Sequence, residues 1–146
     1  MRCSGVLRRT DFAPLDPAQL FTDTAPAFIA DQGPSNPPEG FRLANVPGPV
    51  LDVNGPYHAH LEGNNLRLGL RIEDRHCNTA GWCHGGTLMM FADVQMGIGT
   101  MFKTDEFNFM PTMHMSTDFA VPVKAGAWLI GETEVIRMTR NMAFST

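Results

Sequence analysis

Hydrophobic and polar residues alternate over residues 66–72, the clearest pattern in the chain. Leucine occupies positions 66, 68 and 70 and isoleucine position 72, while Arg, Gly and Arg stand between them. A period of two is typical of a strand with one face in a core and the other in water. An earlier apolar run starts at Gly55 and Pro56 and ends at Leu61, and residues 62–65 have turn chemistry. The pattern therefore predicts a β-hairpin.

A different pattern covers residues 85 to about 102. Its apolar residues would surround a helix rather than form one stripe along it; they are Leu88, Met89, Met90, Phe91, Val94, Met96, Ile98, Met101 and Phe102. A helix that is apolar on all sides belongs in the interior of a domain. We therefore expect one helix here, buried on most of its sides.

The alternation returns after a loop. Residues 112–121 alternate, residues 128–138 read as another strand, and a last strand begins at residues 142–145. The order strand, strand, buried helix, strand, strand predicts an α+β fold in which an antiparallel sheet wraps round one central helix.

The first part of the chain lacks such patterns. A short helical patch at residues 17–21 is followed by a Pro- and Gly-rich stretch at residues 25–40. We expect residues 1–40 to be a partly ordered N-terminal extension and residues 41–146 to be the folded domain.

The composition narrows the function classes. With 146 residues, 43% of them hydrophobic, the chain can form one domain with one core. The formal charge is −4 and the basic residues are scattered, which argues against nucleic acid and against a membrane surface as partners. Three cysteines, an odd number, and an N-terminus without the apolar core of a signal peptide favour the cytoplasm.

The candidate chemistry lies in the stretch HCNTAGWCHGGTLMMFAD, residues 76–93. His76, Cys77, Cys83 and His84 are residue types that bind metals. Structural zinc sites, however, usually pair ligands two to four residues apart and need a second pair elsewhere, which the sequence lacks. We therefore expect no metal site and consider small buried cysteine side chains the better interpretation.

Two other interpretations account for the glycines. Gly85 and Gly86 could simply permit a sharp turn into the helix, but this leaves Asp93 on a mostly buried helix unexplained. Alternatively, free N–H groups at the helix start could hold a carbonyl oxygen that becomes negative in a transition state. Asp93 lies about 12 Å further along the same helix. One site could use both residues if Gly85 of one subunit faced Asp93 of another across a two-fold axis.

The stretch also resembles a known signature. Asn78, Gly81, the run at residues 84–86 and Asp93 fit the pattern N-x-x-G-x-x-H-G-G-x6-D. This pattern is similar to that of hotdog-fold acyl-CoA thioesterases of the phenylacetate-pathway (PaaI-type) group, within the 4-hydroxybenzoyl-CoA thioesterase-like superfamily. The resemblance extends from about residue 40 to residue 146 and includes the D-F-x-x-P-x-x-x-G run at residues 118–126.

The resemblance implies a role for each site residue. Asp93 would be the general base or the nucleophile, and the backbone N–H of Gly85 would polarise the thioester carbonyl. Asn78 would orient water or substrate. The substrate-binding residues would be His84, Gly86 and Thr112; for His84 and Thr112 a purely structural role is about equally compatible with the sequence.

The function implied is hydrolysis of an acyl-CoA thioester to a free acid and CoA. No cofactor is expected, because CoA is part of the substrate, and the protein would be a homodimer or a dimer of dimers with its active site at the subunit interface. Two alternatives stay open: a non-catalytic acyl-CoA-binding hotdog module, and a hotdog dehydratase or hydratase. The second would need a D-x5-H-type signature that is missing at the helix start.

One departure from the family pattern concerns the end of the chain. The resemblance implies that the strand beginning at residues 142–145 continues and that another often follows. We therefore expect the fold to be truncated at its C-terminal strands, with a sheet edge exposed.

Overall fold

The computed structural model describes residues 1–10, 14–23 and 36–146. The predicted extension therefore falls partly outside the described residues, at positions 11–13 and 24–35. The elements are β1 (Arg2–Arg8), the 3₁₀ helix η1 (Pro17–Gln19), β2 (Arg42–Leu43), α1 (Pro49–Asn54), β3 (Tyr57–Glu62), β4 (Asn65–Arg71), the 3₁₀ helix η2 (Asp74–His76), α2 (Gly85–Thr104), β5 (Thr112–Asp118), β6 (Trp128–Gly131), β7 (Val135–Met138) and β8 (Met142–Ser145).

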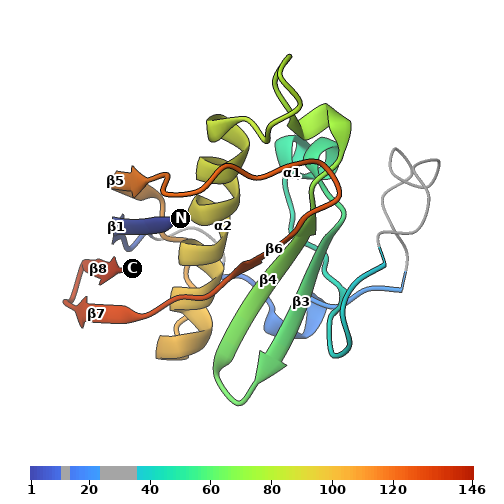
Figure 1. Ribbon diagram of the computed structural model, residues 1–146. Coiled ribbons are helices and arrows are strands. Elements are labelled where there is room, and N and C mark those ends of the chain that lie inside the picture. The colour runs from blue at the N-terminus through green and yellow to red at the C-terminus, as the bar shows by residue number, and fades with distance from the viewer. Residues whose placement is uncertain (11–13, 24–35) are drawn as a thin grey trace.

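The strands of the described residues form two antiparallel sheets of four strands each. One has the order β5-β1-β8-β7 and the other β2-β3-β4-β6. Figure 1 shows the long helix α2 between them. This arrangement confirms the predicted α+β class with one main helix, and both the β3–β4 hairpin and α2 lie where the residue pattern places them.

Helix α2 is the centre of the core. Its buried residues include Leu88, Phe91 and Ile98, which belong to one cluster with the buried face of β4. The ring of Tyr57 on β3 is stacked with that of Phe91, their centroids 6.5 Å apart. On the other side, Met101 packs with Leu7 of β1 and Ala143 of β8, so side chains from both sheets contact the helix, as its composition predicts.

The strand predicted over residues 128–138 is interrupted, and its two halves belong to different sheets. β6 pairs with β4, whereas β7 pairs with β8. At the break, the buried Thr133 donates a hydrogen bond to the Gln95 carbonyl oxygen (3.0 Å) and accepts one from the Gln95 amide nitrogen (2.9 Å). This segment therefore bonds to the helix, and the sheet divides there.

The side chain of Gln95 also bonds to β4. Its oxygen accepts a hydrogen bond from the Leu68 N–H (2.7 Å) and its nitrogen donates one to the Leu66 carbonyl (3.0 Å), all within the buried interior. Glycine is required nearby, because a Cβ atom at Gly99 would lie 2.3 Å from Thr133 Oγ1. One glutamine thus joins α2 to β4 and to the segment between β6 and β7, where the chain passes from one sheet to the other.

Replacing Gln95 with leucine is therefore expected to destabilise the protein. The change leaves buried backbone groups of β4 without their partner, at about 1–3 kcal/mol for each group. We expect a loss of about 3 kcal/mol in the free energy of unfolding, measured by urea denaturation. Gln19→Leu, at an exposed position, is the matched control and should change it by about 0.5 kcal/mol or less. Equal midpoints for the two variants would contradict this role.

The N-terminal residues differ most from expectation. The sequence predicts an extension that ends at residue 40, but residues 2–8 form β1, which lies between β5 and β8 and pairs with both. Leu7 of this strand is fully buried. The last strand, β8, consequently has a neighbour on each side, so the exposed edge expected at β8 is absent within the described residues. Sequence reasoning missed β1 because its seven residues show little hydrophobic alternation.

In the part of the chain that the structure describes, we looked for a helix that could cross a membrane and found none. None of its helices combines the length and the apolar character needed for a span.

Candidate active site

Asp93 lies on α2 and is paired with the first residue of β5. The Thr112 hydroxyl donates a hydrogen bond of 2.5 Å to Asp93 Oδ1. Asp93 is partly buried and Thr112 is exposed, so solvent reaches the pair in a single chain. The structure thus joins two of the residues that the sequence nominates, from elements separated by a loop.

The surface beside Asp93 is open. One helical turn further on, a Cβ atom at Gly97 would have no heavy atom within 4 Å. Large apolar side chains lie exposed on the elements that carry the pair: Met89 on α2 is 36% exposed and Met113 on β5 59%. Met89 lies about one helical turn before Asp93, on the same side of α2, and large exposed apolar patches are typical of a surface that another chain or a ligand covers.

The start of α2 presents one free backbone donor. The N-cap residue is His84, and its Nδ1 atom accepts a hydrogen bond from the Gly86 N–H (3.0 Å). The Gly86 donor is therefore occupied. Gly85 is the first residue of the helix, where the N–H has no acceptor within the helix. Of the glycine pair, Gly85 is consequently the one that can hold an oxyanion, and His84 has a capping role that sequence reasoning left open.

Among the described residues, the packing does not require glycine at position 85. The described neighbour that a Cβ atom there would meet is the ring of Phe119, at ordinary contact distances of 3.6–4.0 Å. Glycine at such a position suits the approach of another molecule, because it leaves the backbone uncovered. Phe119, which follows β5 and is 49% exposed, is a neighbour of the site that sequence reasoning treated only as a strand residue.

Asn78 lies in the loop that precedes the helix. Its side-chain oxygen accepts hydrogen bonds from the N–H groups of Ala80 (3.0 Å) and Trp82 (3.2 Å). These bonds fold the loop, so at least the oxygen of Asn78 has a structural role. The loop is held from outside as well, since Lys124 Nζ lies 5.0 Å from the centroid of the Trp82 ring.

His76, which precedes this loop, is held by hydrogen bonds to the backbone of two other segments. It is buried, and its ring accepts a hydrogen bond from the Glu73 N–H (2.9 Å), while the other nitrogen lies 3.0 Å from the Asn54 carbonyl oxygen. Arg75 Nε also donates to that second nitrogen (3.2 Å), and burial, reinforced by the Arg75 charge, lowers the pKa of His76. Within the described ranges, no group of three or more His, Cys, Asp or Glu residues could hold a metal ion.

The six predicted site residues thus form two groups. Asp93 and Thr112 are in contact, whereas His84, Gly85 and Gly86 form the start of α2 and Asn78 lies in the loop before it. Gly85 and Asp93 are eight residues apart on one helix, about 12 Å along its axis. A single thioester group could not touch both within one chain.

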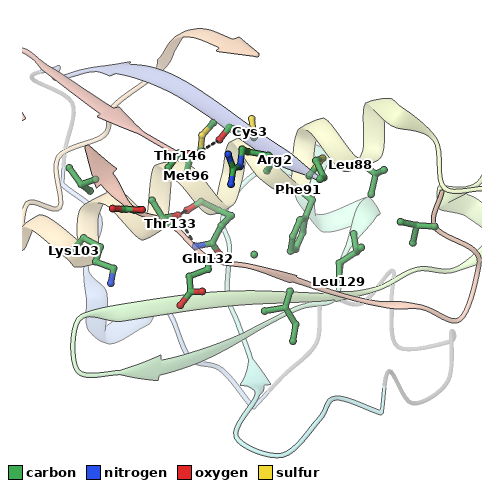
Figure 2. Close-up of a pocket in the computed structure, with 18 of the residues that line it drawn as sticks. Arg2, Cys3, Leu88, Phe91, Met96, Lys103, Leu129, Glu132, Thr133 and Thr146 are labelled. Carbon is green, nitrogen blue, oxygen red and sulfur yellow. Dashed lines mark hydrogen bonds between the residues drawn. The ribbon is translucent and has the colours of Figure 1, made fainter. Parts of the chain in front are cut away.

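A cavity of about 880 Å³ lies elsewhere in the molecule (Figure 2). It extends along β6 and the N-terminal end of β1, and its wall includes Leu88 and Phe91 from α2, Leu129 from β6 and Arg2 from β1. None of the six predicted site residues lines it. The cavity is therefore separate from the two groups.

Two comparisons with known proteins bear on this site. A family model described as the thioesterase superfamily matches residues 80–146, which include Gly85, Asp93 and Thr112. A protein of Pseudomonas aeruginosa, whose name provisionally describes it as an esterase, is 35% identical over 112 residues, 76% of this chain and 84% of the relative. Together they support a hydrolase that acts on thioesters or esters.

Proposed function

Because the chain belongs to the thioesterase superfamily, we propose that it hydrolyses acyl-CoA thioesters to a free acid and CoA, as a PaaI-type enzyme. The observation that carries the proposal is the short hydrogen bond between Thr112 and Asp93 on an open surface of α2. A carboxylate oriented by a hydroxyl and reached by solvent is suited to activate water.

The reaction would use the two groups of residues in different roles. The substrate carbonyl oxygen accepts a hydrogen bond from the Gly85 N–H, at the positive end of the helix dipole. Asp93 takes a proton from water while the water oxygen attacks the carbonyl carbon. The tetrahedral intermediate then collapses with cleavage of the carbon–sulfur bond, and the departing CoA thiolate receives the proton that Asp93 took from water. Asn78 and His84 hold the loop and helix start in place.

The separation of Gly85 from Asp93 supports an active site shared between two copies of the chain. A two-fold dimer would bring Gly85 of one copy to Asp93 of the other. The exposed apolar residues at this surface favour burial in such an interface; they include Met89, Met113 and Phe119. We include a homodimer or a dimer of dimers in the proposal. Location in the cytoplasm stays a prediction.

Release of free thiol from a panel of aryl- and fatty-acyl-CoAs tests the proposal directly. We expect turnover of at least one substrate class, with a matched oxygen ester of the same acyl group as a comparison. Binding of acyl-CoA without turnover, measured by calorimetry, would instead support the non-catalytic module. Turnover of the oxygen ester alone would retain a hydrolase but exclude CoA thioesters as its substrates.

We expect the Thr112 hydroxyl to contribute to the rate of hydrolysis by orienting the Asp93 carboxylate. Thr112→Val keeps the shape and the strand preference but loses the donor, and hydrogen bonds to charged groups contribute about 1.5–3 kcal/mol. We expect kcat/KM to fall by about tenfold or more. Thr112→Ser, which keeps the hydroxyl, should retain most of the activity. If the valine variant is as active as the serine variant, Thr112 has no part in the reaction.

A further inference from the structure

Cys77 and Cys83 face each other across the short hairpin that leads into α2. They form an isolated antiparallel pair. The flanking hydrogen bonds run from the Asn78 N–H to the Trp82 carbonyl (2.7 Å) and from the His84 N–H to the His76 carbonyl (2.8 Å). Bonds on both sides of the pair, with none between its own members, define a non-hydrogen-bonded pair, in which the two backbones approach most closely.

This geometry suits a covalent bond between the two side chains. The Cα atoms of a non-hydrogen-bonded pair lie about 4.5 Å apart and the side chains share one face. Disulfides span Cα distances of about 4.4–6.8 Å. Both residues are free thiols in this structure. The mutual effect of the two groups is visible in the pKa of Cys83, which burial and the neighbouring Cys77 raise to about 11.

We propose that Cys77 and Cys83 form a reversible disulfide when the protein meets hydrogen peroxide, and that this bond slows the reaction at the adjacent helix start. Neither cysteine has a part in the proposed hydrolysis. The existence of the bond does not depend on the proposed function, whereas its effect on the rate does.

The two thiols differ in their exposure to solvent, and this difference determines which of them reacts with peroxide first. Cys77 is partly exposed and Cys83 is buried. The Cys77 thiolate attacks one peroxide oxygen and releases hydroxide, which gives a sulfenic acid. The Cys83 sulfur, on losing its proton, then attacks the Cys77 sulfur and expels a second hydroxide. Two thiols and one peroxide thus become one disulfide and two waters, and a dithiol reductant reverses the change.

The bond would act on the site through its immediate neighbours. Asn78 follows Cys77 directly, and Gly85 is the second residue after Cys83. Cross-strand Cβ atoms lie about 4.5–5.5 Å apart, whereas a disulfide holds them at about 3.8 Å. Closing this gap draws the loop and the helix start together by roughly 1 Å, and a displacement of that size can lower a rate by as much as about 100-fold.

The experiment uses the full chain with Cys3→Ser, which removes the third thiol and keeps a hydroxyl that can bond to Thr117. The protein is treated with hydrogen peroxide, and its free thiols are alkylated under denaturing conditions and counted by intact mass. We expect Cys77 and Cys83 to become unreactive together, with a loss of two hydrogens, and a dithiol reductant to restore both. Peptide mapping should find the two residues linked within one chain.

Single variants provide the controls. With Cys83→Ser, the remaining Cys77 should gain oxygen instead of forming a bond; with Cys77→Ser, the buried Cys83 should stay reduced. Two alkylatable thiols after treatment, oxygen added to Cys77 of the parent while Cys83 stays free, or a bond between chains would each overturn the proposal.

The rate of thioester hydrolysis separates the effect on the rate from the bond itself. We expect oxidation to lower the initial rate at least several-fold, the reductant to restore it, and the Cys83→Ser variant to lack this reversible loss. If the disulfide forms without altering the rate, the proposed effect on hydrolysis is wrong, whereas the proposed disulfide itself is confirmed. Absence of hydrolysis in the untreated protein would contradict the proposed function and not the disulfide.

Discussion

Replacing Asp93 with asparagine is expected to lower kcat for acyl-CoA hydrolysis by about a hundred- to ten-thousand-fold, the usual contribution of a positioned general base. Asparagine keeps the shape of the side chain and an oxygen that can accept the Thr112 hydrogen bond. It cannot take a proton from water. The measurement is thiol release under saturating substrate, so that kcat is separated from KM.

Asp105→Asn is the matched control for this change. Asp105 caps the other end of α2 in the left-handed conformation, which asparagine also adopts readily. Both substitutions remove one negative charge from the same helix, but only the first should affect the rate. Thermal melting should place the two variants within a few degrees of the parent. Full activity in Asp93→Asn would remove this residue from the mechanism.

Replacing Gly85 with proline is expected to lower kcat by about a hundred- to a thousand-fold, the cost of losing one donor to an oxyanion. Proline removes the N–H and is well tolerated at the first position of a helix. The preceding residue fits as well, since His84 is extended and its ψ of 136° lies in the range favoured before proline. The variant should therefore fold, which circular dichroism and melting can verify.

The variant Gly85→Ala distinguishes the effect of losing the N–H donor from the effect of filling the space beside it. Alanine keeps the N–H and adds a Cβ atom that, within the described part of the chain, meets the Phe119 ring at ordinary distance. We expect the alanine variant to be markedly more active than the proline variant. A proline variant as active as the parent would mean that the Gly85 N–H is not the donor. An equal loss in both variants would indicate instead that the site needs the empty space.

Mixing the two inactive variants tests whether the site is shared. If Gly85 of one copy serves Asp93 of the other, a mixed dimer of Asp93→Asn and Gly85→Pro contains one intact site. Random reassociation would then restore about a quarter of the parent activity. Recovery after unfolding and refolding together, compared with each variant refolded alone, is the measurement. Without any recovery, each site lies within one chain or the chains do not exchange.

Most residues of the candidate site could be nominated from the sequence because they lie close together along the chain. The spacing from Asn78 to Asp93 lies within one loop and one helix, and the apolar residues around α2 require a buried helix whatever covers it. The β3–β4 hairpin follows from a period of two and a turn. Such features depend on neighbours in the chain, so the residue pattern was sufficient to predict them.

The sequence could not predict which backbone N–H groups at the helix start are free, because this depends on the geometry of the loop. The sequence nominated Gly85 and Gly86 together, and only the structure shows that His84 occupies the second N–H and leaves the first free. It likewise shows that the oxygen of Asn78 is used within the loop. Hydrogen-bond partners in loops depend on backbone angles that residue types alone do not specify.

By itself, the sequence determined the fold class, the central helix and the residues that carry the candidate chemistry. The tertiary structure decided which distant segments meet: β1 between β5 and β8, the division of residues 128–138 between two sheets, and the contact between Thr112 and Asp93. The physical reason is that local patterns record the environment of each residue, buried or exposed, but not its partner. Partners are chosen when the whole chain packs, because only then do the buried polar groups of α2 and the unpaired strand edges find the groups that satisfy them.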